Sequence, residues 1–148
     1  MTPAELTSHL GYWLRLVSNH VSHSFARKLQ VFDITVAEWA LMRVLFGFDE
    51  SPSQIAERMG MTKGAITKLA DRLIVKSLMI KTSSRNDRRS HTLRLSKKGE
   101  SLVPQLAALA DENEAECFSH LSKADRSVLE RVLKQSVKRF GLNSIPIN

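Results

Sequence analysis

Apolar side chains near the start of the chain recur every three or four residues, which is the spacing of one face of a helix. The pattern predicts a helix over Pro3–Leu29, which would span roughly 40 Å. Its apolar stripe consists of Leu6, Leu10, Trp13, Val17, Val21 and Phe25, and a second stripe beside it consists of Tyr12, Leu16, His20 and His23. We therefore expect this helix to pack on two sides, with Trp13 in a core position.

Signals for a helix start recur along the chain. A Ser or Thr N-cap accepts a bond from a free backbone N–H, and an acidic or amide side chain three residues later returns it. Four segments fit this pattern: Thr2–Glu5, Thr35–Glu38, Ser51–Gln54 and, as the weakest match, Ser122–Asp125. With Thr62 as a further cap, the chain is expected to form helices over Val36–Phe46, Pro52–Met59 and Lys63–Lys76.

The last part of the chain favours two more amphipathic helices. Their apolar positions are Leu102, Leu106, Leu109, Ala110 and Cys117 in the first, and Val128, Leu129, Val132, Leu133, Val137 and Phe140 in the second. Apolar stripes at both ends of a chain exceed what one small lobe can cover. We expect these terminal arms to pair with each other and with a second subunit.

At Leu78 the period changes from helical to alternating. Leu78–Thr82 and Thr92–Leu95 predict two short strands, and the polar segment Ser83–His91 between them predicts the loop of a hairpin. The expected fold class is therefore mainly α, with short helices and a two-stranded hairpin between long terminal helices.

Composition narrows the class of protein. The chain has 148 residues, of which 43% are hydrophobic and 25% charged, and this fits one folded domain. We see neither an apolar run of membrane-spanning length nor a secretory leader, so we expect a cytoplasmic protein with no membrane partner. A single cysteine, Cys117, cannot form an intrachain disulfide and fits a reducing compartment.

The positive charge is concentrated in one stretch. From Lys63 to Lys98, eleven Lys and Arg stand against two acids, Asp71 and Asp87, which leaves −2 on the rest of a chain whose formal net charge is +7. Solvated surfaces usually mix both signs of charge. The concentration therefore indicates a polyanionic partner such as nucleic acid.

The segment Pro52–Thr67 has the pattern of a helix-turn-helix. Ala56 is small enough for two helices to approach, Gly60 permits the turn, and Ile66 packs the second helix on the first. The second helix then faces outward with Lys63, Gly64, Thr67, Lys68, Asp71 and Arg72. In the major groove, Lys and Arg can reach guanine and Thr can offer a hydroxyl or a methyl group. A basic hairpin directly after such a helix is typical of a wing, which inserts arginine into the minor groove.

The hairpin also carries a family motif. The run from Asp87 to Gly99, Asp-Arg-Arg-Ser-His-Thr-Leu-Arg-Leu-Ser-Lys-Lys-Gly, resembles the MarR family signature of Asp-x-Arg followed by Leu-x-Leu-Thr-x-x-Gly. Ser96 stands where Thr is commoner, and Ser77 stands where the family usually has Gly before the first strand. The stretch from Thr62 to Leu78 and the long flanking helices are similar too, so the resemblance covers nearly the whole chain.

This resemblance implies a winged helix-turn-helix regulator. It would be a bacterial homodimer on a pseudo-palindromic operator in double-stranded DNA, and a repressor released by a small aromatic or phenolic effector. Within the wing, Asp87 would hold Arg89 and leave Arg88 to reach the groove. The DNA contacts implied are Ser53, Thr62, Lys63, Thr67, Lys68, Arg72, Arg85, Arg88 and Arg89. A single MarR-like domain of residues 1–148 would comprise a dimerisation helix (1–32), the DNA-binding lobe (33–98) and two further dimerisation helices (99–148).

Other residues support narrower hypotheses. Tyr12, Trp39, Met42 and Arg43 are candidates to line an effector pocket between arm and lobe. His20 and His23 have helical spacing but no Cys or acid beside them, so we expect no metal site there. Cys117 falls on an apolar stripe, where a cysteine behaves as a small hydrophobe.

Enzymatic function has no support in the sequence. It holds neither a glycine-rich phosphate loop nor a nucleophile elbow, so we expect no catalytic site and no cofactor. The alternative to a DNA-binding regulator is a helical protein-interaction adaptor that does not read DNA. The wing arginines, which an adaptor would not need, favour the regulator.

Overall fold

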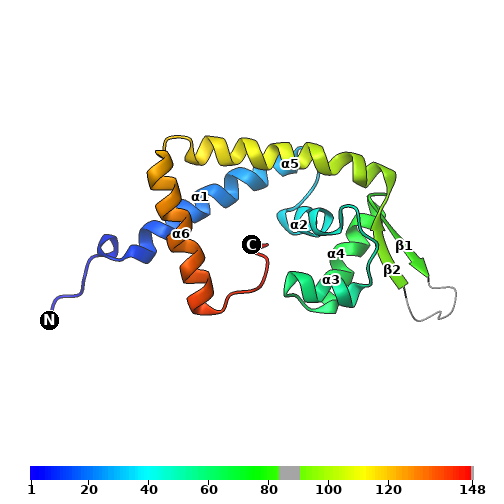
Figure 1. Cartoon of the computed structure of the whole chain (residues 1–148), viewed down its shortest axis with the longest axis horizontal. Helices are drawn as coiled ribbons and strands as arrows, with labels where there is room; N and C mark the ends of the chain where they lie inside the picture. Colours follow the sequence, from blue (N-terminus) through cyan, green and yellow to red (C-terminus); the bar gives the residue numbers. More distant parts are fainter. Residues whose placement is uncertain (84–90, 148) are drawn as a thin grey trace.

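Long helices carry a smaller lobe that contains the hairpin (Figure 1). This computed structural model describes residues 1–83 and 91–147. The long elements are α1 (Leu10–Gln30), preceded by a short 3-10 helix η1 (Leu6–Ser8), then α5 (Lys97–Phe118) and α6 (Lys123–Phe140). The lobe consists of α2 (Val36–Leu45), α3 (Pro52–Met59), α4 (Lys63–Val75), β1 (Met79–Ser83) and β2 (His91–Leu95). The expected fold class is confirmed: mainly α, with a helix-turn-helix and a two-stranded antiparallel sheet.

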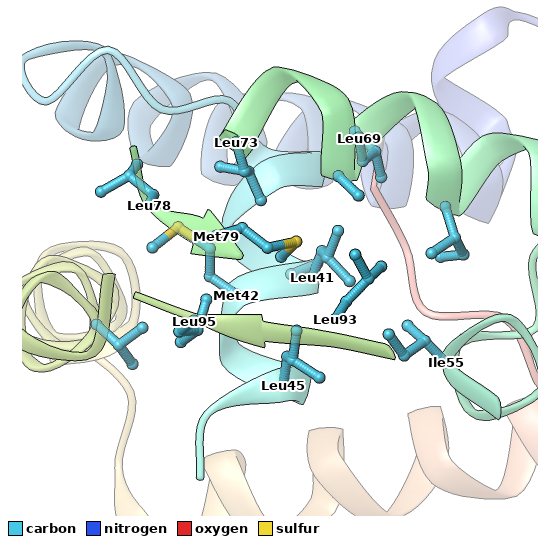
Figure 2. Close-up of a cluster of buried hydrophobic side chains, with 14 of the residues drawn as sticks. Leu41, Met42, Leu45, Ile55, Leu69, Leu73, Leu78, Met79, Leu93 and Leu95 are labelled. Carbon is cyan, nitrogen blue, oxygen red and sulfur yellow. The ribbon is translucent and has the colours of Figure 1, made fainter. Parts of the chain in front are cut away.

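The lobe is held by one cluster of aliphatic side chains and methionines, which Figure 2 shows between α2, α4 and the hairpin. Full burial of one such side chain stabilises a fold by roughly 1.5–3 kcal/mol. The buried members of this cluster include Leu41, Met42, Leu45, Ile55, Leu69, Leu73, Leu78, Met79, Leu93 and Leu95. Because α4 and β2 share this core, the helix and the hairpin are fixed relative to each other.

Two of the expected capping boxes are confirmed in full. Thr35 Oγ1 accepts from the backbone N–H of Glu38 at 3.1 Å, and Glu38 Oε1 accepts from the backbone N–H of Thr35 at 2.9 Å. Ser51 and Gln54 form the same reciprocal pair at the start of α3. At Ser122 only one half forms, since its hydroxyl caps the N–H of Asp125. Asp is one methylene shorter than Glu, which makes the return bond harder to reach.

The expected helix start at Thr2 and the core position of Trp13 are both wrong. The chain forms η1 and begins α1 only at Leu10. Trp13 is half exposed, at 50%, and its indole N–H donates to the carbonyl of Thr7 at 2.9 Å. This bond captures a carbonyl outside α1 and favours a turn over a continuous helix.

A polar network joins α1 to α5. Lys28 Nζ donates to Asn113 Oδ1 at 3.0 Å and to Glu116 Oε2 at 2.6 Å. Asn113 is only 5% exposed, and its Nδ2 donates to the backbone carbonyl of Val21 at 3.2 Å. Buried polar groups satisfied in this way define one arrangement of two helices.

The outer ends of the arms have apolar surface without a partner in the chain. Helix α6 contains no buried residue. Its exposed apolar side chains are Val128, Leu129, Val132, Leu133, Val137 and Phe140, and those of η1 and the first half of α1 include Leu6, Leu10, Leu14, Leu16 and Val17. Exposed apolar surface of this extent typically marks an interface. In the described part of the chain, no helix is both long and apolar enough to cross a membrane.

The glycine of the family motif has a packing role. A Cβ added to Gly99 would lie 2.2 Å from the carbonyl oxygen of Leu78. Ser96 Oγ donates to the carbonyl of Ser77 at 2.7 Å and accepts from the N–H of Gly99 at 3.1 Å. The start of α5 therefore lies directly against the turn between α4 and β1.

That turn contains the departure from the family pattern. Ser77 has φ 63°, in the left-handed region that favours glycine. The backbone N–H of Ser77 donates to the carbonyl of Ile74, and that of Leu78 to the carbonyl of Leu73, each at 2.9 Å. The chain thus makes the usual turn at the end of α4 with a serine.

Ser77→Gly should raise the free energy of unfolding by about 0.5–1 kcal/mol, because glycine adopts the left-handed conformation without strain. Urea denaturation of both proteins measures the difference. Ser101→Gly is the matched control: Ser101 is an exposed residue of α5, where the same substitution should lower stability by a similar amount. A loss of stability in Ser77→Gly would contradict the strain assigned to this turn.

Candidate nucleic-acid interface

The turn between α3 and α4 has the geometry expected of a helix-turn-helix. Gly60 has φ 65°, and the N–H of Met61 donates to the carbonyl of Ala56 at 3.0 Å. Ile66 on α4 is fully buried, and Ala56 is 6% exposed. The small side chain of Ala56 and the left-handed glycine thus allow the two helices to pack closely, as the sequence predicts.

One face of α4 is buried in the lobe and the other is exposed. The buried side chains are Ile66, Leu69, Ala70 and Leu73. The exposed residues are Lys63, Gly64, Lys68, Asp71, Arg72 and Val75, while Thr67 is half-buried. A Cβ added to Gly64 would meet nothing within 4 Å. The first turn of α4 therefore leaves its backbone open to close approach by another molecule.

The two threonines expected to contact DNA already use their hydroxyl groups. Thr62 Oγ1 accepts from the N–H of Ala65 at 3.1 Å and caps α4, and Thr67 Oγ1 donates to the carbonyl of Lys63 at 3.0 Å. Each hydroxyl oxygen keeps a free lone pair, and each side chain keeps its methyl group. Ser53, the second residue of α3, is exposed.

The strands beside α4 form the base of a hairpin. Met79 pairs with Leu95, Lys81 with Leu93, and Ser83 with His91. The first strand therefore begins and ends one residue later than expected, and the second begins one residue earlier and ends at Leu95 as expected, because pairing continues to Ser83 and His91. The sequence-predicted residues Arg85, Asp87, Arg88 and Arg89 lie outside the described residues. Among those described, Lys81 and Arg94 are exposed cations on the hairpin.

The hairpin is also attached to the loop before α3. Glu50 and Leu93 exchange two backbone hydrogen bonds, at 3.1 and 2.7 Å. The carboxylate of Glu50 forms an ion pair with Arg58 of α3, whose guanidinium also lies 5.0 Å from the centre of the Phe48 ring. The hairpin therefore lies in a fixed position beside the helix-turn-helix.

A buried ion pair holds the end of α4. Lys76 Nζ donates to Glu38 Oε1 at 3.1 Å and also to the backbone carbonyl of Asp33. Lys76 Nζ is 3.0 Å from Glu38 Oε2 as well, but this oxygen accepts no hydrogen bond and interacts through charge alone. The Glu38 side chain is 1% exposed. Lys76, one of the eleven cations of the basic stretch, therefore points inward and is not available to DNA.

The environment of Glu38 sets its charge state. Burial raises the pKa of this carboxyl, but the backbone hydrogen bond from Thr35 and the hydrogen bond and charge of Lys76 lower it, and the net pKa lies below its ordinary value. Glu38 is therefore ionised at neutral pH. This ion pair gave no signal in the sequence, since Glu38 and Lys76 are far apart along the chain.

A cavity of about 490 Å³ lies between α1, α2, α5 and the segment after α6. Trp39 and Arg43, two of the four residues proposed for an effector pocket, line it, and the ring of Phe25 meets that of Trp39 edge-on at 6.4 Å. His23, Asn113, Ile145 and Pro146 also line it. None of these four was predicted, and for Ile145 and Pro146 the reason is that nothing in the sequence indicates that the residues after α6 return to the lobe.

The other residues proposed for an effector pocket lie elsewhere. Met42 is fully buried in the core of the lobe, whereas Arg43, the next residue of α2, is exposed. Tyr12 lies near the start of α1, beside Trp13, with 5.1 Å between ring centres. Its surroundings are a separate hollow formed with Leu6 and Leu16. The assignment of Met42 and Tyr12 to this cavity is therefore wrong.

The remaining candidates form no site together. His20 and His23 are both exposed, and only His23 lines the cavity. No three His, Cys, Asp or Glu side chains cluster as metal ligands would within residues 1–83 and 91–147. Cys117 is half-buried on α5.

Comparison with known proteins finds a family model that matches the lobe and solved structures that share the fold. Residues 34–91 match the model of the MarR family. A crystal structure of a MarR mutant from E. coli, complexed with operator DNA, is 22% identical, with a TM-score of 0.75 over 86% of this chain and 93% of that one. BpsR from Bordetella bronchiseptica, whose DNA binding is regulated by 6-hydroxynicotinic acid, is 18% identical, with a TM-score of 0.76 over 91% and 97% of the two chains. The organohalide-sensing regulator RdhR, bound to 2,4-dichlorophenol, is 17% identical, with a TM-score of 0.80 over 92% and 82%.

Proposed function

Residues 34–91 match the MarR family, and on that premise we propose that the chain is a MarR-family, sequence-specific DNA-binding transcriptional regulator. It works as a cytoplasmic homodimer and represses transcription until a small molecule releases it. The observation that carries this proposal is the exposed face of α4, where Lys63, Lys68 and Arg72 stand on a helix whose other face is locked into the lobe.

Each part of the interface has a proposed role. Lys68 and Arg72 read base edges in the major groove, Lys63 and Ser53 bind phosphate, and Thr62 and Thr67 offer methyl groups and lone pairs. The arginines at 85, 88 and 89 enter the minor groove, with Asp87 orienting the loop. The division into arms (1–32 and 99–148) and lobe (33–98) is part of the same proposal.

Random duplex DNA tests the proposal. Sequences retained by the protein should converge on a pseudo-palindrome whose half-sites lie about one helical turn apart, because two copies of α4 must enter successive major grooves. Failure to enrich any motif would contradict sequence reading. The chain would then be the adaptor, which would bind protein through the same arms.

The side chains that line the cavity favour the binding of an aromatic effector that carries a negative charge. Phe25 and Trp39 offer ring surfaces, and Arg43 adds a cation at the same cavity. Stacking on rings with a neighbouring cation suits a phenolate or an aromatic acid. The relatives bound to 2,4-dichlorophenol or regulated by 6-hydroxynicotinic acid support this chemical class. We propose no catalytic step and no cofactor for the protein.

The exposed apolar surface of η1, α1 and α6 predicts a stable two-fold dimer. Sedimentation should give one species of twice the 16.7 kDa chain mass at micromolar concentration. Leu133→Asp places a charge on the apolar stripe of α6 and should raise the dissociation constant at least about tenfold. Ser127→Asp adds the same charge at an exposed polar position of α6 and should leave the dimer intact. A folded monomer of the unmodified chain would contradict the assignment of the arms.

A further inference from the structure

Residues 143–147 return from the end of α6 to the helix-turn-helix, as the red end of the chain in Figure 1 shows. The turn at Gly141, with φ 65°, ends α6 and redirects the chain. The N–H of Ile145 then donates to the carbonyl of Met59 at 3.0 Å, and Ser144 Oγ donates to the carbonyl of Gly60 at 3.0 Å. Both carbonyls lie at the end of α3, where a helix leaves acceptors unpaired.

The absence of a side chain at Gly60 is required by this contact as well as by the left-handed turn. A Cβ at this position would lie 2.8 Å from the Cα of Ser144 and 2.9 Å from its Oγ. A real Cβ atom essentially never lies this close to another heavy atom. Any larger residue at position 60 must therefore displace residues 143–147. The packing of this segment and the helix-turn-helix are therefore linked at one backbone position.

The same segment forms a wall of the cavity. Ile145 and Pro146 line it together with Trp39 and Arg43 of α2. Ile145 and Ile147 are half-buried and pack against the hydrophobic core. Five consecutive residues thus contact both the cavity and the turn that precedes α4.

We propose that residues 143–147 are a strap that couples the cavity to the turn between α3 and α4, so that whatever displaces Ile145 and Pro146 from the cavity also releases the turn. Two hydrogen bonds and two half-buried isoleucines hold the strap, a set of contacts small enough to open locally without unfolding the lobe. A ligand that takes the place of Ile145 and Pro146 binds only the open state and therefore favours it. The link from this opening to DNA release rests on the proposed function.

The coupling is tested by changing one end of the strap and measuring the other. In a Trp13→Phe background, Trp39 is the only tryptophan and reports on the cavity. Gly60→Ala changes the turn end and should shift Trp39 emission to the red and raise its quenching by acrylamide. Ile145→Asp changes the cavity end and should raise hydrogen exchange at the amides of Gly60 and Met61 on the order of tenfold, as for one lost hydrogen bond.

Three controls make the outcome decisive. Ser127→Asp adds the same charge to α6 outside the strap and should change neither signal. Deletion of residues 144–148 should reproduce the Trp39 signal of Gly60→Ala, and the two changes together should add nothing further. Circular dichroism should show unchanged helix content in each variant; if Ile145→Asp unfolds the lobe, the deletion variant supplies the exchange measurement.

If each substitution changes only its own end of the strap, the proposed coupling is wrong. That outcome is unchanged Trp39 quenching in Gly60→Ala, or unchanged exchange at residues 60 and 61 when Ile145→Asp or the deletion is folded. Neither measurement uses DNA, so the strap and the proposed function can fail separately. If the protein selects a DNA motif, the deletion variant should bind that duplex at least about threefold more weakly, as expected when a contact of a fraction of a kcal/mol is lost.

Discussion

Lys76→Met should lower the free energy of unfolding by about 2–3 kcal/mol. The substitution keeps most of the apolar length of the side chain but leaves the carboxylate of Glu38 buried without its cation. Breaking a fully buried pair typically costs about 3–5 kcal/mol. The lysine side chain is 27% exposed, so water can replace part of the lost interaction and the expected loss is smaller.

The pH dependence of this loss follows from the pKa of Glu38. In the unmodified protein the pKa lies below its ordinary value, so the ion pair stabilises the fold fully above the ordinary pKa of a glutamate, and this contribution is lost as the pH falls through the folded-state pKa. Without Lys76, burial raises the pKa of Glu38, and the mutant gains relative stability when the carboxyl becomes protonated. The difference between the two proteins should therefore shrink from pH 7 to pH 4.

Urea denaturation at a series of pH values measures both effects. Lys134→Met is the matched control, because Lys134 pairs with Glu130 on the exposed surface of α6 and its removal should leave stability nearly unchanged. Glu38→Gln together with Lys76→Met should lose less stability than the two single changes combined, since no buried charge remains. A pH-independent loss in Lys76→Met would show that the lysine acts through packing alone.

Lys68→Ala should weaken binding to the selected operator by about 1–3 kcal/mol per lost contact, and a dimer loses two contacts. The side chain is exposed on α4, so its removal should leave stability unchanged. Binding to random DNA should fall much less, because base reading contributes only to the specific complex. Lys138→Ala, an exposed lysine on α6, is the control and should affect neither complex.

Fluorescence anisotropy with the operator and a shuffled duplex, each at several salt concentrations, separates the two kinds of contact. Equal losses on both duplexes, with a reduced salt slope, would show that Lys68 meets phosphate and reads no base. Arg72 on the neighbouring edge of the exposed face would then be the next candidate for base reading.

The elements that could be predicted from the sequence are those governed by local rules. Thr35, Ser51 and Thr62 mark helix starts because a capping bond spans only three residues. Gly60 and Ile66 define the helix-turn-helix for the same reason. The hairpin was located by its change of period, and its bounds moved by one residue because strand pairing depends on the partner strand. These signals together were sufficient for the fold and for the exposed face of α4.

The features that escaped prediction depend on contacts between distant segments. Lys76 was counted among the eleven cations of the basic stretch, and nothing in the sequence showed that it pairs with Glu38. Met42 looked like a cavity residue because the sequence does not show which side of α2 faces the core. Trp13 follows the helical spacing of its neighbours, yet its indole bonds to Thr7 and the helix starts later than its pattern suggests.

The ratio of affinities for a selected and a shuffled duplex of equal length tests sequence reading most directly. Measured at 150 mM salt, roughly physiological, it compares two complexes with the same number of phosphates, so electrostatic attraction alone cannot separate them. We predict that the protein binds the selected duplex at least about a thousandfold more tightly, as specific regulators do. A ratio near one would contradict the assignment of α4 as a sequence-reading helix.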